Sequence, residues 1–329
     1  MSPRKTPESR VNQSILDIHG AAREIPRTIL VPIDFSRASL AALAYAARIA
    51  EGTSHEIQMI HAVTPTPVEE AVTAQQLLVE AAQTRLEQLA KPLRARGLNV
   101  TGLAKIGVAI DVLEGEVARI DPAKSEVVVT MGDRGLSAIR RTLLGSVADG
   151  ALRRLRCPVI VVHENDELSE RLRVVVGYGF ESESLGAVGA FLALFGHGRF
   201  SPRVELVHVI PEYEWVEGTE VPLLRAPPID DVEQLRAEEL HAVAESLRNL
   251  GIDATSTVLR GDPARALLQH AADTRADLLV AGRRPRRAFE RLIFGSVAEG
   301  VTHRAKCAVL TACAAPVTST RPTRAVILT

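Results

Sequence analysis

Glycines are unusually placed in one segment, MGDRGLSAIRRTLLGSVADG at residues 131–150. Two residues separate Gly132 from Gly135, and nine more precede Gly145-Ser146, where a helical pattern begins. Glycine permits a positive φ and lets a ligand approach the backbone without a Cβ in the way. A helix N-terminus offers unpaired N–H groups to a phosphate, and the Ser146 hydroxyl adds a donor. The spacing predicts a phosphate-binding loop, although two tight turns without a ligand would also explain these glycines.

Other chemical motifs are missing or incomplete. The chain has no G-x-x-x-x-G-K-[ST] P-loop, and VGYGFES at 176–182 has Ser182 where a dinucleotide-binding fingerprint needs its third glycine. His61 and His208 stand in predicted strands, where a structural role is more common than that of a general base. No catalytic residue is therefore predicted.

The elements that must position the loop are short apolar strands alternating with helical patterns. Continuous apolar runs, typical of strands covered on both faces, are Ile29–Val31, Ile57–Val63, Val127–Val129 and Val159–Val162. Between the first two, Leu40, Leu43 and Ala47 follow helical spacing after a candidate N-cap, Ser36. The alternation predicts an α/β fold with a doubly wound parallel sheet. Ligands of such sheets bind outside the carboxyl ends of the strands, where Gly132 stands.

The chain contains this pattern twice. The aligned pairs are 145–159 with 295–309, 93–107 with 247–261, and 28–36 with 173–181. The offsets of 150, 154 and 145 differ, as insertions in loops would make them. We expect two copies of one domain, at 27–165 and 170–316, with an N-terminal extension at 1–26 and a C-terminal tail at 317–329.

Composition limits the classes of partner. The chain has 329 residues and a net charge of −1, and aromatic residues make up only 3%, so we expect no nucleic-acid partner. No segment approaches the roughly 20 apolar residues of a membrane helix, and residues 1–26 lack the apolar region of a secretory signal. Cys157, Cys307 and Cys313 form no Cys-x-x-Cys pair. We expect buried free thiols in a cytoplasmic protein.

Three elements together resemble the universal stress protein family: VPIDFS at the end of the first strand, the Gly-x-x-Gly-x9-Gly-Ser loop and the closing strand CPVIVV. The resemblance covers about residues 27–165 and, in a degraded copy, about 170–316. It implies a Rossmann-like domain of the adenine nucleotide alpha hydrolase type, with five parallel strands. Members are often dimeric, some are fused in tandem, and most act in stress survival or signalling without established turnover.

The resemblance also implies a site for ATP, or for ADP or AMP, in the first copy, with Mg²⁺ as a possible companion. Its implied residues are Pro32, Asp34, Val63, Met131, Gly132, Arg134, Gly135, Gly145, Ser146 and Val147. Asp34 corresponds to a carboxylate that contacts the nucleoside, with Pro32 on the pocket wall. The backbone of Val63 corresponds to the position that reads the adenine edge.

Other implied contacts lie along the phosphates. Met131 and Gly132 would follow the nucleoside and the first phosphate, and the loop from Gly135 to Val147 would bind phosphates through amides and the Ser146 hydroxyl. The arginines Arg134, Arg140 and Arg141 are candidates for the β or γ phosphate. Two alternatives stay open from the residues alone: Asp34 as a helix cap before Ser36, and a metal shared by Asp34 and Asp133.

The second copy departs from the motif. Pro285 stands at the position of Gly135, Gly179 at that of Asp34, and Gly177 at that of Pro32, while Gly282 and Gly295-Ser296 are kept. Proline offers no amide, so we expect the second domain to bind nucleotide weakly or not at all. The arginines of 283–291 form a basic run, either a solvated loop face or a site for a phosphorylated or acidic partner.

Three functions remain possible: a nucleotide-binding stress or signalling protein, which we favour, a slow ATP hydrolase, and a scaffold without nucleotide. The segments at 157–164 and 307–314 are expected to be the last strands of their sheets. Exposed strand edges invite pairing. We therefore expect an internal pseudo-dimer of the two domains, with a further homodimer left undecided.

Overall fold

The fold is known from a computed structural model, which describes residues 27–65, 72–120, 126–135, 144–196, 198–211, 229–284 and 296–314. The first half comprises β1 (Arg27–Pro32), α2 (Arg37–Ala50), β2 (Glu56–Val63), α3 (Val72–Ala95), β3 (Asn99–Ile106), α4 (Ala109–Arg119), β4 (Glu126–Gly132), α5 (Ser146–Arg154) and β5 (Val159–Val162). The second comprises β6 (Arg173–Gly177), α6 (Ser182–Phe195), β7 (Arg203–Ile210), α7 (Ile229–Asn249), β8 (Asp253–Arg260), α8 (Pro263–Asp273), β9 (Leu278–Gly282), α9 (Ser296–Arg304) and β10 (Ala308–Ala312).

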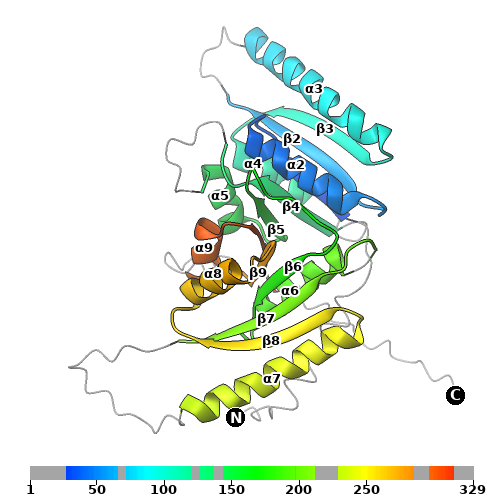
Figure 1. Cartoon of the computed structure of the whole chain (residues 1–329). Coiled ribbons are helices and arrows are strands. Elements are labelled where there is room, and N and C mark those ends of the chain that lie inside the picture. The colour runs from blue at the N-terminus through cyan, green and yellow to red at the C-terminus, as the bar shows by residue number, and fades with distance from the viewer. Residues whose placement is uncertain are drawn as a thin grey trace, which may run out of the picture.

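The ten strands form one sheet in the order β3-β2-β1-β4-β5-β10-β9-β6-β7-β8 (Figure 1). Within each half all pairings are parallel. The order in which successive strands are added along the sheet reverses at the neighbours β1 and β4, and again at β6 and β9. The predicted α/β class with two doubly wound five-stranded sheets is confirmed. The helices lie on both faces because the apolar strands must be covered on each side.

The halves meet along their last strands. β5 and β10 pair antiparallel, with Ile160 opposite Leu310 and Val161 opposite Val309. This pairing joins the two parallel sheets edge to edge and gives the expected internal pseudo-dimer. Neither inner edge is left open, which removes a site at which other strands could pair.

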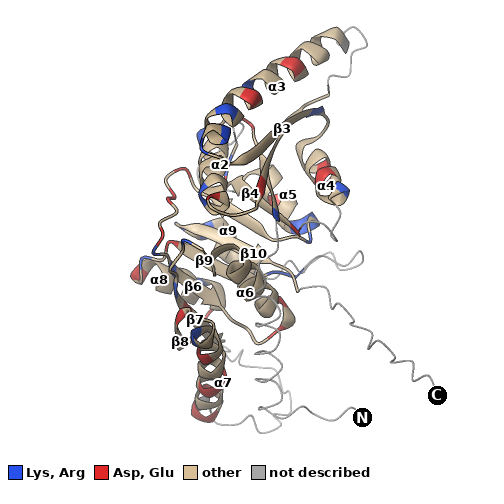
Figure 2. Cartoon of the chain, turned by 90° about the vertical axis from the view of Figure 1, so that its right-hand side faces the viewer, with Lys and Arg blue, Asp and Glu red and all other residues tan. Residues whose placement is uncertain are grey.

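Three apolar clusters fill the space between helices and sheet. The largest contains buried residues of α2, α3, α6 and α7 and is continuous across both halves. On the opposite face, α4 and α5 cover the first half, and α8 and α9 cover the second. Figure 2 shows acidic and basic positions along both α3 and α7. A few charged side chains of the described residues are nevertheless buried: Arg27, Glu116, Asp133, Glu239 and Arg283.

The predicted helix signal at Ser36 is confirmed, because its Oγ accepts a hydrogen bond from the Ser39 N–H at 3.2 Å and α2 begins at the next residue. The three cysteines are free thiols, as expected, but only Cys313 is buried; Cys157 and Cys307 are partly exposed. Among the described residues, no helix combines the length and the apolar character that crossing a membrane requires.

Tyr45, in α2, provides a test of the core. Its side chain is buried, and the hydroxyl has no hydrogen-bond partner among the described residues. A buried hydroxyl without a partner is desolvated for no gain. We expect Tyr45→Phe to leave the free energy of unfolding unchanged or to raise it by about 1 kcal/mol, measured by urea denaturation. A loss of more than about 1 kcal/mol would contradict this account of the hydroxyl.

Candidate functional site

A cavity of 510 Å³ opens in the first half, at the carboxyl ends of β1 and β4. These neighbouring strands are the place where the strand order reverses, which is the usual ligand site of doubly wound sheets. Nine of the ten implied site residues line it: Pro32, Asp34, Met131, Gly132, Arg134, Gly135, Gly145, Ser146 and Val147.

The glycines of the loop are required by close contacts. A Cβ on Gly132 would lie 2.7 Å from the carbonyl carbon of Ala38 in α2, and one on Gly135 would lie 2.3 Å from Oδ2 of Asp34. A Cβ on Gly145 would lie 3.3 Å from the carbonyl oxygen of Asp133. None of the three has a positive φ, so that part of the expectation was wrong. They allow backbone and carboxylate to approach one another closely around the cavity.

Helix α5 points its N-terminus into the cavity. Gly145 precedes the helix with φ −65° and ψ 150°, and its own N–H donates to the carbonyl oxygen of Asp133 at 2.8 Å. This amide is therefore already hydrogen-bonded within the protein, whereas it was expected to bind phosphate. The amides of Ser146, Val147 and Ala148 belong to the first turn and have no partner inside the helix. They carry the partial positive charge of the helix end.

Asp34 both caps a turn and faces the cavity. Its Oδ1 accepts a hydrogen bond from the Ser36 N–H at 3.0 Å, while Oδ2 lies toward Gly135. Phe35, between Asp34 and Ser36, has a left-handed φ of 63°, a conformation uncommon for a bulky residue. The cap of α2 itself is Ser36. The capping alternative therefore accounts for one carboxylate oxygen, and the second is directed at the loop.

One implied residue, Val63, lies outside the cavity lining, whereas Arg134 lies in it as expected. The carbonyl oxygen of Val63 accepts a hydrogen bond from the Gly107 N–H at 2.9 Å. The Nε of Arg134 lies 2.9 Å from Oδ2 of Asp133, which partly offsets its charge. Arg140 and Arg141 lie outside the described residues.

Sequence reasoning missed part of the cavity wall. The additional lining residues are Ile33, Ser39, Ile60, His61, Ala62, Ala109, Leu113, Leu144 and Ala148. Ala109 and Leu113 stand four residues apart on α4, a spacing that places both on one helix face and could have indicated an apolar wall. His61, in β2, has its Nδ1 2.6 Å from the carbonyl oxygen of Ile33, which agrees with a structural role.

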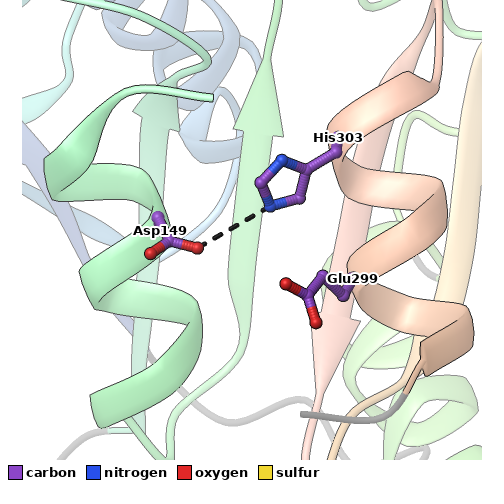
Figure 3. A group of neighbouring side chains, drawn as sticks. All are labelled: Asp149, Glu299 and His303. Carbon is purple, nitrogen blue, oxygen red and sulfur yellow. Dashed lines mark ion pairs between the residues drawn. The ribbon is translucent and has the colours of Figure 1, made fainter. Parts of the chain in front are cut away.

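Asp34 and Asp133 do not form a metal site, because Asp133 is paired with Arg134 and does not line the cavity. A group of potential metal ligands lies elsewhere, where α5 faces α9: Asp149, Glu299 and His303 (Figure 3). Nε2 of His303 is 3.7 Å from Oδ1 of Asp149. The guanidinium of Arg153 donates to both oxygens of Asp149, at 3.0 and 2.9 Å, and to Glu299 at 2.9 Å. These carboxylates therefore already have a cation between them.

The second half repeats the backbone frame without the carboxylate. Phe180 has a φ of 60°, like Phe35, and a Cβ on Gly282 would lie 2.7 Å from the carbonyl carbon of Glu183. At the position of Asp34, the Gly179 N–H donates to Oγ of Ser184 at 2.9 Å. Pro285 and Gly295 lie outside the described residues.

The basic run of the second half is not simply a solvated loop face. Arg283 is fully buried, with 0% of its surface exposed, and Arg284 pairs with Glu181 and, at 3.3 Å, with Glu183. Arg283 is buried because its guanidinium finds backbone carbonyl acceptors in the first half. The arginines at 286, 287 and 291 lie outside the described residues.

Two histidines provide a pH test with opposite signs. Burial acts to lower the pKa of His163, but Asp166, whose Oδ2 is 3.0 Å from Nδ1, outweighs it and holds that pKa above the ordinary 6.5. Burial lowers the pKa of His208. A raised histidine pKa stabilises the fold fully below 6.5, and this contribution disappears as pH rises through the folded pKa. A lowered one makes stability fall as pH drops below 6.5.

We therefore expect NMR titration to give a pKa above 6.5 for His163 and a pKa below 6.5 for His208. His163→Asn should weaken the loss of stability on the alkaline side of 6.5 in urea denaturation. His208→Asn should instead weaken the loss on the acidic side. Identical slopes in the two variants would show that neither environment acts as described.

An open, doubly wound sheet repeated in tandem, with a glycine-lined cavity at its switch point, places the chain in the Rossmann-like α/β class. The family model described as "Universal stress protein family" matches residues 26–163 and again residues 170–312. The chain therefore belongs to the universal stress protein family, as the resemblance indicated.

Relatives cover nearly the whole chain. Universal stress protein Rv2623 of Mycobacterium tuberculosis (strain ATCC 25618 / H37Rv) is 28% identical over 294 residues, covering 86% of this chain and 95% of its own. A universal stress protein of Mycolicibacterium smegmatis is 29% identical over 293 residues, with the same coverage. The crystal structure of a universal stress protein from Archaeoglobus fulgidus DSM 4304 superposes with a TM-score of 0.66 at 21% identity, covering 88% of this chain and 98% of that one. It supports the fold.

Proposed function

We propose that the first domain, residues 27–165, binds ATP or a related adenine nucleotide in the 510 Å³ cavity, and that occupancy alters the conformation or partner choice of the protein in a stress response. The observation that carries this is convergence. Residues from two strand ends, a loop and a helix N-terminus, which lie as far apart in the sequence as Pro32 and Ala148, line one cavity. Its volume falls within the roughly 300–1,000 Å³ of ligand pockets.

The lining suggests a division of tasks. Ile60, Leu113 and Met131 offer apolar surface suited to a purine ring, and the Asp34 carboxylate can accept hydrogen bonds from ribose hydroxyls. The first turn of α5 is suited to the phosphates, through its unpaired amides and the Ser146 hydroxyl. The described lining supplies a single carboxylate, so Mg²⁺ would be held mainly by the phosphates.

The second domain, residues 170–316, is proposed to bind nucleotide weakly or not at all. Gly179 replaces the carboxylate, and Ser184 bonds to its amide. A cytoplasmic location is proposed as well, since free thiols fit a reducing compartment.

The experiment uses the full chain and isothermal titration calorimetry with ATP, ADP and AMP. Ser146→Ala should weaken ATP binding about tenfold, the effect of one lost hydrogen bond to a charged group. Ser296→Ala, at the aligned position, is the matched control and should leave the affinity unchanged. A ligand that binds only the folded state must raise its stability, so no binding and no thermal shift with any of the three would overturn the proposal. Release of phosphate above a blank, lost in Ser146→Ala, would indicate hydrolysis in addition.

A further inference from the structure

Arg283 stands where the first half has Asp133, directly after Gly282 at the end of β9. The backbone is the same in both halves: the Arg283 N–H donates to the carbonyl oxygen of Ala312 at 2.7 Å, and the Asp133 N–H donates to that of Val162 at 2.9 Å. The side chains differ completely. Asp133 stays within its own half beside Arg134, whereas Arg283 leaves its half.

The Arg283 guanidinium is bound by the first half. Nη1 donates to the carbonyl oxygens of Leu152 at 2.7 Å and Leu155 at 2.6 Å, and Nη2 donates to that of Cys157 at 2.8 Å. Arginine is almost never fully buried unless it is paired. Among the described residues no carboxylate pairs with Arg283, so these carbonyls are its acceptors.

Two of the three acceptors, the carbonyls of Leu152 and Leu155, belong to the C-terminal end of α5, and the third, Cys157, follows it. The helix ends at Arg154 with Leu155 as its C-cap, and the last carbonyls of a helix have no partner inside it. A cation at this end also interacts favourably with the helix dipole. Arg283 therefore satisfies the C-terminus of the helix whose N-terminus, at Ser146, lines the cavity. The helix has nine residues, so its ends are only about 13 Å apart.

A second contact across the halves holds the same helix. Arg153 of α5 donates to Glu299 of α9 at 2.9 Å. Contacts from the second half thus reach α5 at its C-terminal end and, through His303, at Asp149 in its first turn. Residues 145–148 line the cavity.

We propose that Arg283 is a positioning residue for the nucleotide site of the first domain. This inference rests on the proposed function. Arg283 fixes the position and direction of the α5 axis, so that the amides of residues 146–148 can donate hydrogen bonds to the phosphates. The second domain, which lacks its own carboxylate at Gly179, thereby completes the site of the first. Because binding and positioning are linked, nucleotide should in turn stabilise the contact between the halves.

The test compares full-chain variants at a temperature where circular dichroism shows each to be folded. Arg283→Met removes the guanidinium, and Arg283→Lys keeps a charge but cannot reach three carbonyls in the same fork geometry. The matched control is Arg199→Leu, because Arg199 also crosses between the halves, to Glu51, and does not contact α5. We expect ATP affinity to fall about tenfold in Arg283→Met, less in Arg283→Lys, and less than about twofold in Arg199→Leu.

A second readout separates positioning from general stability. Hydrogen exchange at the amides of Asp149 and Leu155, which donate to the carbonyl oxygens of Gly145 and Ala151 within α5, is measured without nucleotide. It should become faster in Arg283→Met and stay unchanged in Arg199→Leu. Unchanged exchange in Arg283→Met, or unchanged ATP affinity, would overturn the inference. If the unmodified chain binds no adenine nucleotide, the proposed function fails, whereas the exchange measurement still decides whether Arg283 holds α5.

Discussion

Gly135→Ala is expected to weaken ATP binding by about ten- to a hundredfold. This is the effect of losing one hydrogen bond to a charged group, here the Asp34 carboxylate. The new Cβ would lie 2.3 Å from Oδ2 of Asp34, a distance that cannot be maintained. The carboxylate cannot simply move away, because Oδ1 is bound to the Ser36 N–H and Phe35 fixes the turn. Either Asp34 or the loop must leave its place, and the cavity loses its shape.

Calorimetry on the full chain measures this effect. Gly115→Ala is the matched control, since a Cβ there meets nothing within 4 Å and α4 should tolerate it. Because the clash needs both partners, Gly135→Ala should add little to the loss already present in Asp34→Ala, a double-mutant cycle with strong coupling. Full additivity of the two losses, or unaltered affinity in Gly135→Ala, would show that the contact does not shape the site.

Leu310→Ala is expected to lower the free energy of unfolding by about 2–5 kcal/mol and to weaken both halves together. Leu310 is completely buried in β10, opposite Ile160 of β5, and belongs to the apolar cluster that is continuous across the halves. A cavity at this point removes contacts that both sheets share. The two halves should therefore unfold in one cooperative transition.

Urea denaturation followed by circular dichroism, with calorimetry for the number of transitions, tests this. Leu77→Ala is the control: its side chain on α3 is 60% exposed, and the change should stay within about 0.5 kcal/mol. Two separated transitions, of which Leu310→Ala shifts only the second, would contradict the view of one shared core.

The sequence predicted the fold well because its signals are local and repeated. A few neighbouring residues are enough to indicate each feature: the apolar strand Ile29–Val31, the cap at Ser36 and the glycine loop. The alignment of 145–159 with 295–309 shows the same pattern a second time. The cavity's strand-end and loop residues follow from the rule that ligands bind at the carboxyl ends of parallel strands.

What the sequence did not predict depends on contacts between distant residues. The carbonyl of Val63 is occupied by Gly107, 44 positions later, and the acceptors of Arg283 lie as far as 131 positions earlier. No sequence pattern near Arg283 distinguishes it from the other arginines of the basic run. The glycines were predicted to allow a positive φ and the approach of a ligand, whereas the close approach of Gly135 to Asp34 is visible only in the packed structure.

The antiparallel join of β5 and β10 has one more consequence. In an assembly of two identical subunits, every substitution is made twice, so both members must keep whatever either one needs. Here one polypeptide carries both partners, and their association does not depend on protein concentration. Each half is thus free to evolve alone. Gly179 and Arg283 are differences that such freedom permits: the second half has a glycine where the first has a carboxylate, and it directs a buried cation at the first half.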